Sequence, residues 1–254
     1  MAFSSTTRRR RRRVVLALVT VAAVTVLVVW GRNWIGSQPP GPSPQRTVAP
    51  TSAAGPTSAP AAIPAPRFDA ARAQLAALSI ESWDRVQDFK RYRFGQAWSD
   101  DVNVEFGHNG CNTRDDILRR DLASLVVRPG TCYAQSGILH DPYTGTTIDF
   151  VRGPDTSDSV EIDHVVSLAD AWYKGARWWD AQRRLDFAND PINLLAVSPK
   201  ANFDKAFRDA ASWLPPNQAF RCDFAARQVN VKTVYGLWVS GKEKQAIADV
   251  LARC

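Results

Sequence analysis

One stretch of the sequence, residues 160–206, concentrates side chains that could hydrolyse a phosphodiester. It opens with Glu161-Ile-Asp163-His164 and closes with Asn202-Phe-Asp-Lys205. A histidine that titrates near neutrality can take a proton from water. Carboxylate and amide oxygens are the ligands that a hard divalent ion prefers. These residue types predict a phosphodiesterase site built on one metal ion.

Two short strands are expected to carry the first part of this site. Residues 160–165 are typical of a strand that ends in the Asp163-His164 pair, and Asn193 leads a second strand, residues 194–197. Neighbouring residues on a strand point to opposite faces. Asp163 and His164 can therefore serve one site only if a loop follows His164 at once, and the sequence supplies a loop there.

A helix is expected to carry the second part. Ser198 can cap it, and Pro199 suits its first turn. Spacing by three and seven residues predicts a polar face that suits an anion and a metal, opposite an apolar face that packs into the core. The polar face would hold Asn202, Lys205 and Asp209, and the apolar face Phe203, Ala206, Phe207 and Ala210.

Taken together, these motifs resemble those of the HNH endonucleases, also called ββα-metal or His-Me finger enzymes. In particular, the chain resembles exported HNH proteins related to the C-terminal domain of GmrSD-type modification-dependent restriction enzymes. Further blocks carry the same resemblance over about residues 85–254: C-N-T-R-D-D from Cys111, D-P-Y-T-G from Asp141, F-A-N-D-P from Phe187 and W-L-P-P-N from Trp213. The departure from the family name is Asn202, which stands where the second histidine would be.

The resemblance implies a role for each residue of the stretch. His164 would be the general base, and Asp163 and Asn202 would be the metal ligands. Asn193 would hold the catalytic loop and orient the His164 ring, and Lys205 would face the phosphate. Two protein oxygens leave most coordination positions to water and substrate, which suits Mg²⁺, with Mn²⁺ as the alternative. The expected substrate is nucleic acid, with DNA favoured over RNA.

Two further side chains are weaker candidates. Arg114, on the helix after Cys111, could contact a phosphate, although a solvated arginine is the simpler interpretation. Glu161 lies two residues before Asp163 on the same strand face and could assist the metal, or could be an ordinary surface carboxylate.

The remaining pattern predicts an α+β fold: a helical domain with a β-hairpin and an embedded ββα-metal core. Residues 132–139 and 146–152 flank a Pro- and Gly-containing turn and form the expected hairpin. Thr113 is expected to cap a helix that runs on through Leu125. Further helices are expected at residues 69–78, 181–188 and 217–235, and after a capping box at Ser240. Aromatic core for an irregular region would come from Trp83, Phe89, Tyr92, Phe94 and Trp98.

The four cysteines show no Cys-x-x-Cys spacing, so a zinc site is not indicated. They allow three disulfide pairings, of which we favour the sequence-local one, Cys111 with Cys132 and Cys222 with Cys254. Disulfides form in oxidising compartments. The cysteines therefore predict a domain that is stapled by disulfides outside the cytoplasm.

The N-terminal residues carry features of export. Six consecutive arginines, residues 8–13, precede the apolar residues 14–30. We expect residues 1–34 to be a transmembrane signal anchor that places the rest of the chain outside, with a cleaved signal peptide and a secreted product as the alternative. Residues 35–66 are a Pro-, Ala- and Ser-rich linker, and residues 67–254 form the HNH nuclease-like domain. Membrane contact is expected through the N-terminal segment only.

Net charge gives little information about the substrate. The chain carries +7, but residues 1–66 hold eight arginines and no acidic residue, which leaves 24 basic against 25 acidic residues in the rest. Within that rest, residues 174–232 are locally positive, with 10 basic and 6 acidic residues. This balance supports a phosphate partner only weakly.

Two rival functions fit the same sequence. One is a catalytically silent extracellular module that uses the positive segment to bind nucleic acid or an acidic wall polymer. The other is an exported phosphodiesterase that acts on another phosphate ester. Metal-dependent cleavage of DNA that requires His164 separates both from the endonuclease.

Overall fold

The computed structural model describes residues 68–83 and 86–254, which fold as helices packed against two small antiparallel sheets. This is the predicted α+β class. In the described part, no helix is long and apolar enough to cross a membrane. The predicted anchor, residues 1–34, and the predicted linker, residues 35–66, lie outside the described residues.

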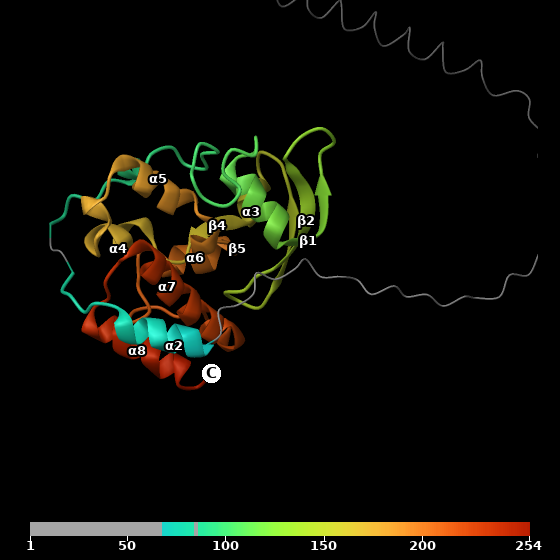
Figure 1. Cartoon of the computed structure of the whole chain (residues 1–254). Coiled ribbons are helices and arrows are strands. Elements are labelled where there is room, and N and C mark those ends of the chain that lie inside the picture. The colour runs from blue at the N-terminus through green and yellow to red at the C-terminus, as the bar shows by residue number, and fades with distance from the viewer. Residues whose placement is uncertain (1–67, 84–85) are drawn as a thin grey trace, which may run out of the picture. The chain divides into compact units, whose positions relative to one another are not determined.

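The elements follow one another in chain order (Figure 1). The α-helices are α2 (Phe68–Ala77), α3 (Thr113–Asp121), α4 (Leu168–Tyr173), α5 (Ala181–Asn189), α6 (Pro199–Lys205), α7 (Arg221–Tyr235) and α8 (Gly241–Leu251). The strands are β1 (Leu122–Val127), β2 (Ala134–His140), β3 (Thr147–Val151), β4 (Glu161–His164) and β5 (Leu194–Val197). Single 3-10 turns are η1 (Arg91–Phe94), η2 (Ser157–Ser159), η3 (Ala176–Trp178), η4 (Pro191–Asn193) and η5 (Gln218–Phe220).

The expected hairpin is present as β2 and β3, but it belongs to a three-stranded sheet of order β1-β2-β3. The predicted continuation of the preceding helix through Leu125 is wrong, because α3 ends at Asp121 and the chain turns directly into β1. The segment Leu-Ala-Ser-Leu-Val-Val finds a partner strand in β2, and pairing overrides its helical spacing. The cap of α3 is Asn112, whose side chain accepts from the Asp115 N–H, rather than Thr113.

The second sheet and the helix after it form the predicted strand, strand, helix unit. β4 pairs antiparallel with β5, with His164 opposite Leu194 and Asp163 opposite Leu195. Ser198 then caps α6, with Pro199 in its first turn. Every residue of β5 is buried, so the unit is anchored in the core on the side away from solvent.

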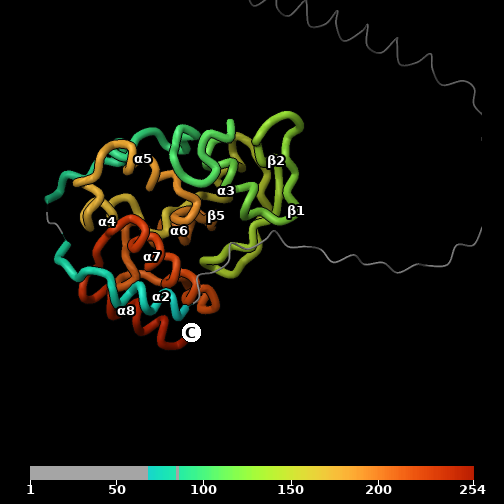
Figure 2. Tube along the Cα trace, in the orientation of Figure 1, coloured from blue at the N-terminus to red at the C-terminus, as the bar shows by residue number. Residues whose placement is uncertain are grey.

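α7 is the central helix of the described residues (Figure 2). Phe224 on one side of it packs with β5 and α6. Val229 on the other packs with α2 and α8. It begins at Arg221, four residues later than predicted, because η5 occupies the intervening turn. α7 therefore links the sheet that carries the candidate site to the helices at the C-terminal end of the chain.

Both predicted disulfides are confirmed. Cys111 bonds to Cys132 beside the start of α3, and Cys222 near the start of α7 bonds to Cys254 after α8. No cysteine in the described residues is free. The sequence-local pairing was therefore the correct one of the three.

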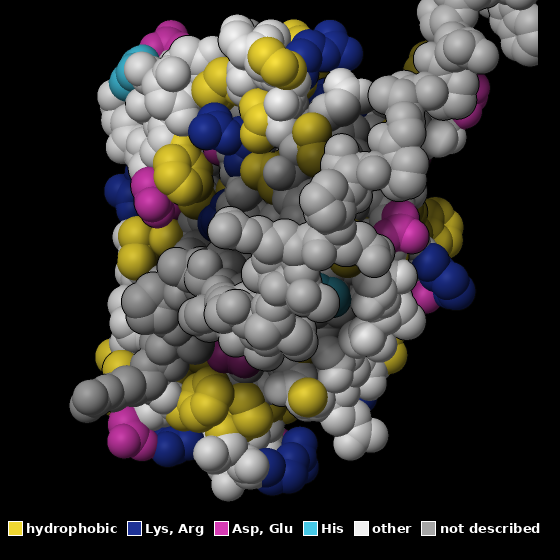
Figure 3. Space-filling view, turned by 90° about the vertical axis from the view of Figure 1, so that its right-hand side faces the viewer, with side chains coloured by type: hydrophobic (Ala, Val, Ile, Leu, Met, Phe, Trp, Pro, Cys, Tyr) yellow, Lys and Arg dark blue, Asp and Glu magenta, His cyan; other side chains and the backbone are white. Residues whose placement is uncertain are grey.

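The aromatic residues of the irregular region divide between core and surface. Phe94 is buried among α4, α5 and α7, whereas Tyr92 is 75% exposed and Trp83 is 44% exposed. The prediction that Trp83 and Tyr92 supply core is therefore wrong. On the side of the molecule near the three-stranded sheet, hydrophobic, basic and acidic side chains are interspersed (Figure 3).

Candidate active site

The strand, strand, helix unit opens onto a hollow of about 830 Å³. Asp163 and His164 from β4 and Asn202 from α6 line it, together with Glu161 and Arg114. The structure thus brings together side chains that lie up to 88 residues apart in the chain. Asn193 and Lys205 do not line the hollow; they lie behind it.

His164 is held in one tautomer by the main chain. Its Nε2 lies 2.8 Å from the carbonyl oxygen of Ala188. A carbonyl can only accept a hydrogen bond, so Nε2 carries the proton and Nδ1 has a lone pair. The indole of Trp98 stacks on the ring, with centroids 6.1 Å apart and planes 14° apart. Burial lowers the pKa of His164 to about 3, so the ring is neutral at physiological pH.

Asp163 is nearly buried and is contacted from two sides. The Tyr143 hydroxyl donates to Oδ2 at 2.6 Å, and the Lys205 ammonium donates to Oδ1 at 3.1 Å. Burial raises the pKa of Asp163, and the Lys205 charge and the hydrogen bonds only partly oppose this. Burial and the adjacent carboxylate also raise the pKa of Tyr143, so its hydroxyl remains a donor. The Asp163 carboxylate is therefore held in place, but the charge of Lys205 and the hydrogen bonds do not fully offset the cost of burying it.

Lys205 is fully buried, and its ammonium also donates to the main-chain oxygen of His164 at 2.7 Å. The structure therefore places it beneath Asp163 and His164, joining the two consecutive residues of β4, rather than at the open surface of the hollow. In this position it ties the Asp163 side chain to the main chain of His164. Direct contact of Lys205 with a phosphate stays a prediction.

Asn193 fixes the loop that follows His164. Its side chain accepts from the Val166 N–H at 2.8 Å and donates to the Val166 carbonyl at 3.2 Å. Its own carbonyl accepts from the Val165 N–H at 2.7 Å. These three bonds agree with a role in holding the loop. The ring of His164 is instead oriented by Ala188 and Trp98.

Asn202 faces β4 across the hollow. Its side-chain NH₂ group donates to Glu161 Oε2 at 2.6 Å. The side-chain carbonyl oxygen of Asn202 takes no part in this bond. The predicted polar face of the helix does not extend to Asp209, because α6 ends at Lys205 and Asp209 binds Lys174. The expected apolar core face is wrong for Phe203, which is 83% exposed, and Phe207, which is 56% exposed. Of that face, Ala210 is buried in the core as predicted.

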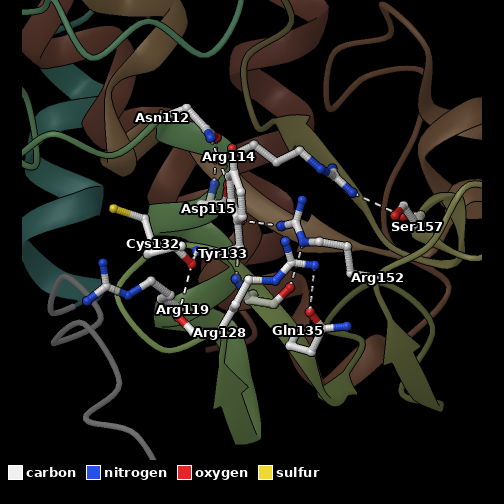
Figure 4. A network of polar contacts seen from close by, with 12 residues as sticks. Asn112, Arg114, Asp115, Arg119, Arg128, Cys132, Tyr133, Gln135, Arg152 and Ser157 are labelled. Carbon is white, nitrogen blue, oxygen red and sulfur yellow. Dashed lines mark hydrogen bonds and ion pairs between the residues drawn. The ribbon is translucent and has the colours of Figure 1, made fainter.

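Arg114 is fixed at the rim of the hollow. Its guanidinium donates to the main-chain oxygens of Val160 at 2.8 Å and Ser157 at 3.1 Å (Figure 4). Its neighbour Asp115 pairs with Arg152, so the helix carrying Arg114 is tied to the end of β3. Burial lowers the pKa of Arg114 from its high ordinary value. The guanidinium is a positioned cation rather than a freely solvated one.

The donor set fits a hard divalent cation. Asp163, Glu161 and Asn202 all offer oxygen, and all line the same hollow. In the described part of the chain, no cluster of three or more His, Cys, Asp or Glu residues has the arrangement of a metal site.

Three contacts of the site were not foreseen from sequence. Tyr143 lies in a turn 20 residues before its partner Asp163, Trp98 stacks on His164 from an irregular segment, and Ala188 acts through its main-chain oxygen. In the sequence, the block Asp141-Pro-Tyr-Thr-Gly indicated that Tyr143 belongs to a turn, but not that it contacts Asp163. A main-chain acceptor such as Ala188 leaves no signal in side-chain types.

Comparison with known proteins shows the family of the chain. Residues 112–250 match the family of GmrSD restriction endonucleases, C-terminal domain. An uncharacterized secreted protein of Arthroderma benhamiae is 40% identical over 146 residues, which cover 57% of this chain and 68% of the relative. No solved structure matches the chain. The matched residues include both strands and the helix of the candidate site, and the chain belongs to the family of GmrSD restriction endonuclease C-terminal domains.

Proposed function

We propose that the protein is an exported, metal-dependent endonuclease of the HNH type that hydrolyses phosphodiester bonds of DNA. The observation that carries the proposal is the state of His164: a neutral ring with a defined Nδ1 lone pair, beside an oxygen donor set at an open hollow. Membership of a family named for restriction endonucleases supports nucleic acid as the substrate.

His164 acts as the general base. Water gives its proton to Nδ1 as the water oxygen attacks phosphorus, and the bond between phosphorus and the departing oxygen breaks with its electron pair on that oxygen. The ring becomes an imidazolium. The Ala188 carbonyl accepts from Nε2 in both states and favours the charged one. The low pKa of the buried ring ensures that it is not protonated before substrate arrives.

Asp163 and Asn202 hold the divalent ion, with Mg²⁺ the best match to oxygen ligands and Mn²⁺ the alternative. When bound, such an ion stabilises negative charge on the scissile phosphate and on the departing oxygen. Glu161 orients Asn202 through their 2.6 Å hydrogen bond. The Arg114 guanidinium at the rim attracts the phosphate.

Lys205 and Asn193 are positioning residues. Lys205 holds the Asp163 carboxylate and the His164 main chain at a fixed separation. Asn193 closes the loop after His164, so the ring cannot swing away with a moving backbone. Both act through neighbours and do not touch the reacting atoms.

The reaction takes place outside the cytoplasm. Two disulfides need an oxidising compartment, and the relative of Arthroderma benhamiae is described as secreted. The predicted N-terminal anchor, or signal peptide, directs export of the domain from the cytoplasm. Membrane attachment through residues 1–34 belongs to the proposal.

The decisive experiment is cleavage of supercoiled plasmid by the oxidised full-length protein in Mg²⁺, Mn²⁺ or EDTA. The wild type should nick the plasmid in metal but not in EDTA, and His164→Ala should lose at least about 100-fold in rate, the usual contribution of a general base. His140→Ala removes an exposed histidine away from the hollow and should cleave like the wild type.

Binding of DNA without cleavage in any metal, unchanged in His164→Ala, would replace this proposal by the silent binding module. Cleavage of small phosphodiesters with no cleavage of DNA would replace the substrate and leave the chemistry intact.

A further inference from the structure

The hollow over His164 is the middle part of a longer groove. On one side it adjoins a hollow of about 890 Å³, with which it shares Phe89, Ala169 and Phe207. On the other side it adjoins one of about 270 Å³, with which it shares Arg91, Trp98 and His164. The three hollows, joined by these shared lining residues, are treated as one groove that includes the proposed base.

Exposed aromatic rings line this groove. Phe203 and Phe207 follow Asn202 at the end of α6, where the helix stops at Lys205 and Ala206 takes a positive φ of 49°. Trp83 reaches the same side of the groove and lies 6.4 Å from Phe207, ring centre to ring centre. Tyr173 meets the edge of Trp83 at 5.3 Å. A flat partner that stacks on these exposed rings would remove their apolar surface from water.

Charge along the groove is distributed unevenly. Arg91, Arg114 and Arg208 line the central hollow and Lys242 lines the larger one. The carboxylates that line it, Glu161 and Asp163, are confined to the proposed metal position. Outside that position, the charged residues that line the groove in the described part of the chain are cations, which match the phosphates of a polyanionic chain.

We propose that this groove binds an unpaired nucleic-acid strand, with bases stacked on Phe203, Phe207 and Trp83 and phosphates near Arg91, Arg208 and Lys242. The inference rests on the proposed function in one respect, since it places the scissile phosphate over His164. A duplex cannot use these rings, because its bases are paired and stacked on one another. An unpaired base presents a free π face to an aromatic side chain.

The substrate class follows from this placement. The protein selects single-stranded segments, loops or flaps over continuous duplex. Stacking does not distinguish strongly between bases. The groove therefore recognises that a strand is unpaired rather than which sequence it has.

The test is fluorescence anisotropy with a labelled 12-mer of thymidine, and with a labelled blunt duplex, on full-length protein in EDTA at fixed salt. The wild type should bind the single strand at least tenfold more tightly than the duplex. Phe203→Ala together with Phe207→Ala should weaken single-strand binding by at least about tenfold, as loss of stacking on a ring does, and should change duplex binding less than twofold.

Trp178→Ala is the matched control, because Trp178 is 74% exposed and lies outside the groove; it should bind both probes like the wild type. Phe203→Tyr with Phe207→Tyr keeps both rings and should restore binding. Equal affinity for the two probes, or no effect of the Phe to Ala changes, overturns the inference. Elution of the wild type as a dimer that the Phe to Ala changes dissociate would identify a second copy as the occupant and also overturn it.

Because anisotropy in EDTA needs no catalysis, its result is independent of plasmid nicking. Nicking without strand preference would leave the proposed function standing and remove this inference. Strand-selective binding with no cleavage in any metal would remove the proposed function and leave this inference standing.

Discussion

Two regions of the molecule bury lysine ammonium groups beside carboxylates, and they differ in how many ammonium groups contact each aspartate. In the helical region, Lys174 and Lys232 share Asp170 and Glu243, at 2.5 to 2.9 Å. In the candidate site, Lys205 alone faces Asp163. Asp170, Lys174, Lys232 and Glu243 of the first region are all buried, whereas Asp163 of the second lines the hollow.

The pKa directions express this difference. Burial raises the pKa of Asp170, but Lys232 and Lys174 outweigh burial and the net pKa is lowered. Burial also raises the pKa of Asp163, and there a single lysine and the Tyr143 hydroxyl do not outweigh it. Asp163 therefore lacks the second cation that Asp170 has. A cation in the hollow would supply it.

Removal of a lysine from the helical region should cost most. Lys232→Met leaves Asp170 and Glu243 buried with one lysine, and we expect a loss of about 3–5 kcal/mol in the free energy of unfolding. Lys205→Met should cost less, about 1–3 kcal/mol, because Asp163 can take up a proton in compensation. Urea unfolding at pH 7 measures both. Equal losses would contradict the contrast between the two regions.

Divalent cations should stabilise the candidate site only. At a free Mg²⁺ concentration 100 times the dissociation constant, the wild type should gain about 2.7 kcal/mol over its value in EDTA. Asp163→Asn should lose most of this gain, since it removes the carboxylate ligand.

The control for the cation experiment is Asp149→Asn, which alters an exposed carboxylate on β3 and should keep the full gain. Each variant is compared with itself in EDTA, so differences in basal stability cancel. An undiminished Mg²⁺ effect in Asp163→Asn would remove Asp163 from the ligand set.

A further expected effect is a pH dependence caused by His164. The folded protein keeps this ring neutral down to a pKa of about 3, whereas the unfolded chain protonates it below 6.5. Its contribution to stability is present above pH 6.5 and is lost as pH falls toward 3. Relative to His164→Gln, the wild type should lose about 1.4 kcal/mol per pH unit in this window. Urea titrations of both proteins at pH 7, 6, 5 and 4 test this, and parallel curves would contradict it.

Local features of the fold were predictable because their causes are local. Ser198 and Pro199 begin α6, Asp180 caps α5, and Ser240 with Glu243 forms the capping box of α8. The strand that ends at His164 follows from the same kind of pattern. Such signals lie within a few residues of the element they set.

Features that depend on distant partners were not predictable. β1 exists because β2 pairs with it, and helical spacing alone gave the wrong element. The burial of Lys205 depends on Asp163, 42 residues away. Phe203 and Phe207 have the spacing of a core face, but α6 ends before a neighbour can cover them. Amphipathic spacing in a sequence identifies the apolar face of a helix, but it does not show whether another element packs against that face.

The contact between α2 and the last helix has a consequence for the order of folding. Arg72 donates to the carbonyl of Leu251 at 2.7 Å across a separation of 179 residues, and Ile80 bridges to Val239. α2 lies against α7 and α8 at one end of the described residues (Figure 1). Closing so long a loop is entropically costly, so α2 docks only once the helices at the opposite end of the sequence are available. Until then the apolar side chains of α2 that the folded protein buries, Ala71 and Leu75, stay exposed to water.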